Sequence, residues 1–98
     1  MEIAIVRLTT GEELIGEYNP DPGTERDEIE IVNPFIIIPT GDGKISTMQY
    51  MPYAKNVARG LLISKQFVMF VVVPHEQLVD GYREMTGQII TPPSQIIT

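Results

Sequence analysis

The chain has 98 residues, a formal net charge of −6 and a hydrophobic content of 43%. This length fits a single domain, and the acidic balance argues against a basic surface that wraps duplex nucleic acid. The sequence has no cysteine and one histidine, which excludes disulfides, thiolate chemistry and a histidine-rich zinc site within one chain. We expect no metal site, no cofactor and no enzymatic activity, because the sequence offers no nucleophile, base and orienting group together.

The first part of the chain predicts a β-hairpin. Two alternating stretches, residues 2–8 and 12–18, flank a three-residue loop that ends at Gly11, which supplies a left-handed turn position. This loop length places Leu8 opposite Glu12 and puts the even-numbered residues on one apolar face. The face that we assign to the core consists of Ala4, Val6, Leu8, Leu14, Gly16 and Tyr18.

Glycine and proline divide the middle of the chain. Gly16 lies inside a strand, where glycine marks either a sharp bend, of the kind that closes small barrels, or a close approach of another backbone. Residues 19–28 form a loop rich in proline and charge, which we interpret as a solvated excursion, with a carboxylate cation site as the alternative. Residues 29–38 predict a strand that Pro34 breaks, bulges or confines to an edge. Residues 44–53 predict a fourth strand, and a short piece follows at 61–63.

The most apolar segment is the unbroken run of residues 67–73. It is too short to span a membrane and is mostly β-branched and aromatic, so it predicts a strand buried on both faces. An antiparallel strand with one wet face alternates with polar residues, and this one does not. We therefore expect its second face to be covered, either by a helix of the same chain or by another copy of the protein.

The C-terminal part predicts a helix and a tail. Apolar residues at helical spacing mark a helix within residues 75–87, with Gly87 at its C-cap and His75 in a capping or solvent-exposed role. We expect the helix to pack on the sheet. Residues 88–98 repeat Gln-Ile-Ile-Thr around a Pro-Pro pair and predict an extended tail, which is either disordered or adds to a neighbour's sheet edge. No signal peptide is visible, so we expect an intracellular protein without a membrane partner.

Residues 3–74 resemble Sm-like proteins. Leu8, Gly11 and Gly16 have the spacing of that family's first motif, and Asn33 stands where the family has its Met-Asn pair. The turn Lys65-Gln66, followed by a strand that ends in Val-Val-Pro, resembles the bacterial RNA-chaperone version. Ala58-Arg59-Gly60 resembles the Arg-Gly turn of the archaeal and eukaryotic version. We prefer the first turn because it directly precedes the strong strand. The layout as a whole most resembles Sm-like proteins of tailed bacteriophages.

The resemblance implies a mainly β fold: a strongly bent five-stranded antiparallel small barrel over residues 1–74, with a C-terminal α-helix over 75–87. It implies a homo-oligomeric ring of five to seven copies, in which the fourth strand of one copy pairs with the fifth strand of the next. It also implies a cytoplasmic location, in the host cell if a phage encodes the chain. The implied interface residues are Phe67, Val68, Met69, Phe70 and Val71.

The same resemblance implies that the ring binds single-stranded RNA at its pore, as an RNA chaperone or processing factor. The residues that would contact RNA are Asn33, Lys65, Gln66 and Arg59. The alternative is an oligomeric scaffold that keeps the barrel but binds no nucleic acid. The acidic net charge favours this alternative, as does Ile31, which stands where the family has its base-stacking side chain and cannot stack as an aromatic ring does.

Overall fold

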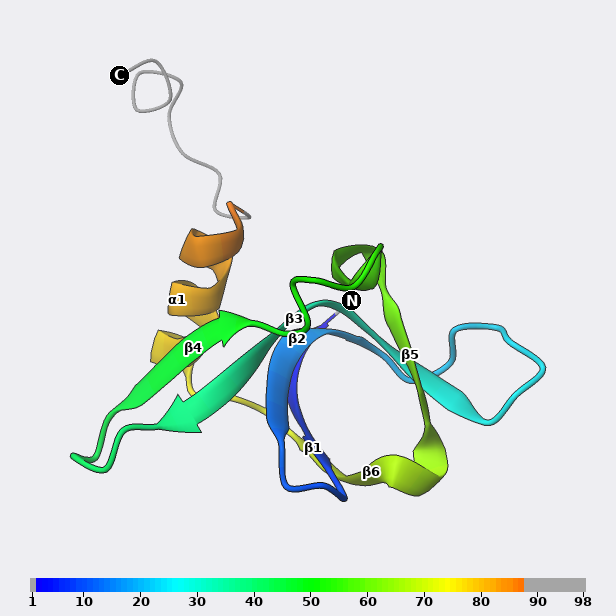
Figure 1. Cartoon of the computed structure of the whole chain (residues 1–98), viewed down its shortest axis with the longest axis horizontal. Helices are drawn as coiled ribbons and strands as arrows, with labels where there is room; N and C mark the ends of the chain where they lie inside the picture. The colour runs from blue at the N-terminus through cyan, green and yellow to red at the C-terminus, as the bar shows by residue number, and fades with distance from the viewer. Residues whose placement is uncertain (1, 88–98) are drawn as a thin grey trace, which may run out of the picture.

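The computed structural model describes residues 2–87, which form one curved antiparallel sheet and a C-terminal helix (Figure 1). The strand order is β4-β3-β2-β1-β6, and β5 also pairs with β3. The mainly β prediction and its C-terminal helix are confirmed. The elements are β1 (Glu2–Leu8), β2 (Glu13–Asn19), β3 (Glu28–Pro39), β4 (Ile45–Gln49), the 3₁₀ turn η1 (Val57–Arg59), β5 (Leu61–Ser64), the 3₁₀ turn η2 (Lys65–Phe67), β6 (Val68–Val72) and α1 (Glu76–Thr86).

The first hairpin has the predicted register. Val6 pairs with Leu14, and the Leu8 N–H donates to the Glu12 carbonyl at 2.8 Å. Gly11 has the expected positive φ of 97°. Short loops fix the register of a hairpin, and a shift by one residue would expose the apolar face. That face is indeed buried, with Val6 and Leu14 fully inaccessible to solvent.

Gly16 allows β2 to approach β3 closely. A Cβ atom on Gly16 would lie 2.7 Å from Ile31 Cγ1 and 2.8 Å from the Val32 carbonyl oxygen. The pairing of β2 with β3 shifts register at this position, between Ile15 and Glu17. Only glycine fits where two backbones come this near, which confirms the close backbone approach, one of the two interpretations of this residue.

The described part of the chain has six strands, so the predicted count of five is wrong. The expected fourth strand, residues 44–53, ends early because Met51 takes a left-handed conformation (φ 47°) and Pro52 has no N–H for the ladder. After an excursion over residues 50–60, the chain returns as β5. Both β4 and β5 pair with the long strand β3, on the side that β2 leaves free.

Two apolar clusters lie on opposite faces of the sheet. One contains Val6, Leu8 and Leu14 of the predicted hairpin face together with Ile29 and Ile31 of β3. The other contains Ile15, Ile37 and Tyr82, and it is covered by α1. The alternation of the hairpin assigned one face of β2 to the core, whereas the helix buries the other face as well.

The helix α1 has the predicted C-terminal cap. Gly87 is left-handed (φ 72°), and its N–H is directed at the carbonyls of Arg83 and Glu84. His75 is the exposed N-cap residue and makes no side-chain cap bond. Tyr82 anchors the helix: its ring meets Phe35 edge-on at 5.9 Å, and its hydroxyl donates to the Asn33 carbonyl at 2.8 Å. The helix therefore covers β2 and β3.

The prediction that residues 67–73 are buried on both faces is wrong for a single chain. Val68 and Val71 pack on the core, but Met69 is 57% exposed and Val73 is 88% exposed. The reason is topological: within residues 2–87, β6 is the last strand of the sheet and pairs with β1 alone. Because α1 packs over β2 and β3, no element among residues 2–87 covers the outer face of β6.

The expected tail, residues 88–98, lies outside the described residues. Within residues 2–87, no helix is long and apolar enough to cross a membrane. The same residues contain no cluster of three or more histidine, aspartate or glutamate side chains arranged to hold a metal ion.

Candidate nucleic-acid interface and assembly edge

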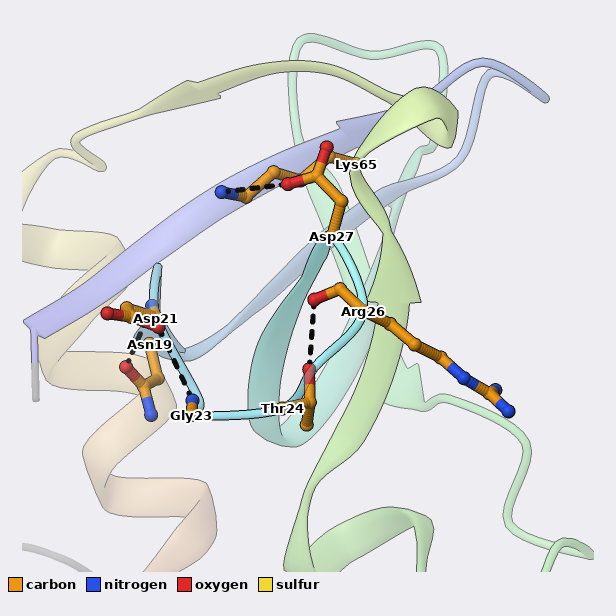
Figure 2. Close-up of polar contacts among 7 residues, drawn as sticks. All are labelled: Asn19, Asp21, Gly23, Thr24, Arg26, Asp27 and Lys65. Atoms are coloured by element: carbon orange, nitrogen blue, oxygen red, sulfur yellow. Dashed lines mark hydrogen bonds and ion pairs between the residues drawn. The ribbon is translucent and has the colours of Figure 1, made fainter.

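The loop between β2 and β3 meets the η2 turn. The Lys65 N–H donates to the Asp27 carbonyl at 2.9 Å, and Lys65 Nζ lies 3.4 Å from Asp27 Oδ1 (Figure 2). Local bonds shape the loop: Asn19 Oδ1 accepts from the Asp21 N–H, and Asp21 Oδ1 accepts from the Gly23 N–H. These are turns that Asn and Asp side chains commonly stabilise. The turn at Lys65 and Gln66 is thus fixed against an ordered loop.

The surroundings of Lys65 are acidic. Its side chain is about half exposed and already pairs with Asp27, and the neighbouring loop adds further carboxylates. Arg26 is exposed, and Figure 2 shows its side chain pointing away from the Lys65–Asp27 pair. A phosphate at Lys65 would have to compete with this carboxylate. The carboxylates of residues 20–28 are Asp21, Glu25, Asp27 and Glu28.

The structure separates Asn33 from Lys65. Asn33 lies within β3, with a positive φ of 53°, and its carbonyl accepts the Tyr82 hydroxyl. Lys65 lies at the other end of the β3–β5 ladder, where Ser64 pairs with Glu28. Five residues of extended chain separate Glu28 from Asn33, or about 16 Å. Asn33 therefore helps to hold the helix on the sheet through its carbonyl. Its left-handed backbone conformation is one that asparagine adopts more readily than most residues.

Arg59 and Gln66 lie at opposite ends of β5. Arg59 ends η1, which precedes β5, whereas Gln66 is exposed in η2, which follows it (Figure 1). The residues predicted to contact RNA therefore fall into two groups within one chain, with Lys65 and Gln66 at one end of β5 and Arg59 at the other. Ile31, at the family's stacking position, is fully buried and presents no face to a base.

β6 forms an apolar edge. Its pairing with β1 shifts at Arg7 and Leu8, whose partners are Phe70 and Val68. Met69 is thus the extra residue of a bulge, which breaks the simple alternation of inward and outward side chains. The large apolar side chains that this edge exposes are Phe67, Met69, Phe70, Val72 and Val73.

One signal in the sequence was overlooked: residues 43–75 contain no aspartate or glutamate. Their four cationic side chains give this run a charge of +4. The remaining residues carry −10, and the two sum to the net charge of −6. The run contains β4, β5 and β6, the three strands that have one edge without a partner strand in the described part of the chain. Counting charge along the chain would have revealed this segregation. Its cations are Lys44, Lys55, Arg59 and Lys65.

Local contacts shift the pKa values of two side chains on either side of β4, Tyr50 and Asp42. Burial, followed by a hydrogen bond with Glu12, raises the pKa of the Tyr50 hydroxyl. A hydrogen bond from Thr40 lowers the pKa of Asp42 in the exposed turn before β4. Both groups keep their usual state near neutral pH, so neither indicates acid–base chemistry.

No protein-family model matches the chain, and no curated protein matches it.

Proposed function

We propose that this chain is a non-enzymatic, self-assembling protein with an Sm-like small barrel, and that it forms a ring through β6. The observation that carries the proposal is the exposed apolar edge of β6, where Met69 is 57% exposed. Contiguous apolar surface with free backbone donors and acceptors is a template for strand pairing. The strongly curved sheet of Figure 1 and the close approach of β2 to β3 at Gly16 support the barrel.

The proposed occupant of the β6 edge is the β4–β5 edge of a second copy. β3 engages one side of β4 and of β5, which leaves their outer sides without a strand among residues 2–87. A single chain thus carries two different free edges at the two ends of its sheet. Joining unlike edges head to tail generates a ring when the rotation closes, and the resemblance to Sm-like proteins suggests five to seven copies.

The charge distribution supports self-association of an acidic chain. All three edge strands lie in the run that contains no carboxylate. Pairing these edges therefore brings no acidic side chains together, while the remaining carboxylates stay on other surfaces. Like charges directly opposite one another would destabilise a strand pair.

Two matched substitutions test this assembly. Met69→Glu places a charge in the proposed interface, whereas Met85→Glu makes the same change on α1, where Met85 is 47% exposed. Light scattering of the eluting protein should show that Met69→Glu lowers the mass and that Met85→Glu retains the mass of the unmodified chain. An oligomer that survives Met69→Glu would disprove the β6 interface.

A second candidate function is binding of single-stranded RNA by the assembled ring. The observation that favours it is the exposed turn at Lys65 and Gln66, which is held against an ordered loop. A titration with labelled oligo-U and oligo-A, at about 50 and about 200 mM salt, tests it, because phosphate contacts make affinity depend steeply on salt. Absence of salt-dependent binding would exclude RNA binding, and the scaffold would then be the one remaining candidate function. Affinity unchanged in Lys65→Ala would exclude this turn as the site.

A further inference from the structure

The segment between β4 and β5 is an ordered excursion rather than a simple turn. Met51 and Asn56 take left-handed conformations. The Ala54 N–H donates to the Met51 carbonyl at 2.9 Å, and the Arg59 N–H donates to the Asn56 carbonyl at 3.1 Å. η1 follows and lies against β3. The side chains of residues 50–59 are therefore presented from a defined backbone at the end of β5 opposite to η2 (Figure 1).

This segment carries an exposed aromatic ring and two exposed cations. Tyr53 is 85% exposed, the highest exposure of any described aromatic side chain. Lys55 and Arg59 are both exposed, and neither forms an ion pair within residues 2–87. Two carboxylates lie near the ends of this segment: Glu30, whose Cδ would lie 3.0 Å from a Cβ placed on Gly60, and Glu12, which hydrogen-bonds with the Tyr50 hydroxyl. Glu30 also accepts a long hydrogen bond from Asn19, at 3.4 Å.

The contrast with the η2 turn is electrostatic. Lys65 pairs with Asp27 in a loop rich in carboxylates. Lys55 and Arg59, by contrast, form no ion pair within residues 2–87. Phosphates would therefore meet less competition at the 50–59 segment than at η2.

We propose that residues 50–59 bind single-stranded nucleic acid, with a base stacked on Tyr53 and backbone phosphates at Lys55 and Arg59. Aromatic rings together with cations are the elements that bind single strands without reading their sequence. The exposed side chains here are largely polar or charged, whereas the centre of a protein-docking surface is apolar. This inference rests on the second candidate function and relocates its site from η2 to the β4–β5 segment.

The test is a fluorescence-anisotropy titration of the full chain with labelled oligo-U, across a range of salt concentrations. Tyr53→Ala should weaken binding about tenfold, and Tyr53→Phe should keep the affinity, because the stacking face remains. The double variant Lys55→Glu/Arg59→Glu should flatten the slope of log affinity against log salt by about 1.4, since each phosphate contact contributes about 0.7 on a single strand. An oligo-dT arm shows whether the 2′-hydroxyl contributes.

Two matched controls make the result interpretable. Lys44→Glu makes the same charge reversal in the exposed turn before β4 and should change binding less than the double variant does. Lys65→Ala should leave the affinity unchanged. Loss of binding in Lys65→Ala, with full binding by Tyr53→Ala and by the double variant, would overturn the relocation but leave RNA binding in place. No binding by the unmodified chain would overturn both.

Discussion

Replacing Gly16 by alanine should destabilise the protein because of where β2 crosses β3. The new Cβ would lie 2.7 Å from Ile31 Cγ1 and 2.8 Å from the Val32 carbonyl oxygen, and both distances are shorter than a real Cβ contact. Ile31 is fully buried and the carbonyl belongs to the backbone, so neither neighbour can yield easily. Overpacking of this kind costs about 1–3 kcal/mol. The loss of glycine's freedom in the unfolded chain offsets about 0.4–1 kcal/mol of that cost.

The expected net loss in free energy of unfolding is about 1–2 kcal/mol, which lowers the Tm of a chain this size by about 5–15 °C. The matched control is Gly81→Ala in α1, where an added Cβ meets no atom within 4 Å. That variant should gain about 1 kcal/mol, because alanine favours a helix interior over glycine. Urea unfolding followed by circular dichroism, at one fixed protein concentration, measures both. Equal stability of Gly16→Ala and the unmodified chain would refute the close approach of β2 to β3.

Three other predictions follow from named contacts. Tyr82→Phe should cost about 1 kcal/mol of unfolding free energy at neutral pH, because the Asn33 carbonyl loses its buried donor; an unchanged urea midpoint would contradict this. Burial, and then the charge of Glu17, raises the pKa of Tyr82 to about 12. Since an unfolded tyrosine titrates near about 10, stability should be intact below pH ~10 and fall as the pH rises through the folded pKa, more steeply in the unmodified chain than in Tyr82→Phe. Parallel pH profiles would show that this hydroxyl is not protected. Asp27→Asn should change stability by less than about 1 kcal/mol, because its pair with Lys65 is solvent-exposed; a larger loss in a thermal melt would show that the pair supports the loop.

The first hairpin and the end of the helix could be predicted because short-range rules determine them. A three-residue loop that ends in glycine sets the pairing of Val6 with Leu14. A glycine after a helical stripe sets the cap at Gly87. Both depend on residues that are close together in the chain.

The split of the fourth strand and the environment of β6 depend on distant residues. The apolar run of residues 67–73 indicates a strand that avoids water, but composition alone does not distinguish a central strand from an edge strand that another chain covers. Likewise, the helical stripe includes Tyr82 without indicating that the ring packs on Ile15, on the outer face of β2. These contacts follow from topology.

The residues predicted to contact RNA lie apart in the structure, again because strand pairing between distant parts of the chain determines their positions. The resemblance places Asn33 and Lys65 in one site, whereas in the structure Asn33 lies beyond the Ile31 end of the β3–β5 ladder and Lys65 lies beyond its Ser64 end. Only the end of the 50–59 segment, at Ala58 and Arg59, resembles a family motif, and the exposure of Tyr53 becomes visible only with the fold. The charge segregation around it was readable from the sequence, because it requires only that acidic residues be counted along the chain.

The mass of the unmodified full chain in solution tests the proposed assembly most directly. One chain has a mass of 11.0 kDa. Sedimentation equilibrium at micromolar concentration should give a single species of several times that mass, unchanged on moderate dilution, because a closed ring leaves no free β6 edge. A sedimenting mass of one chain at all concentrations would contradict ring formation through β6.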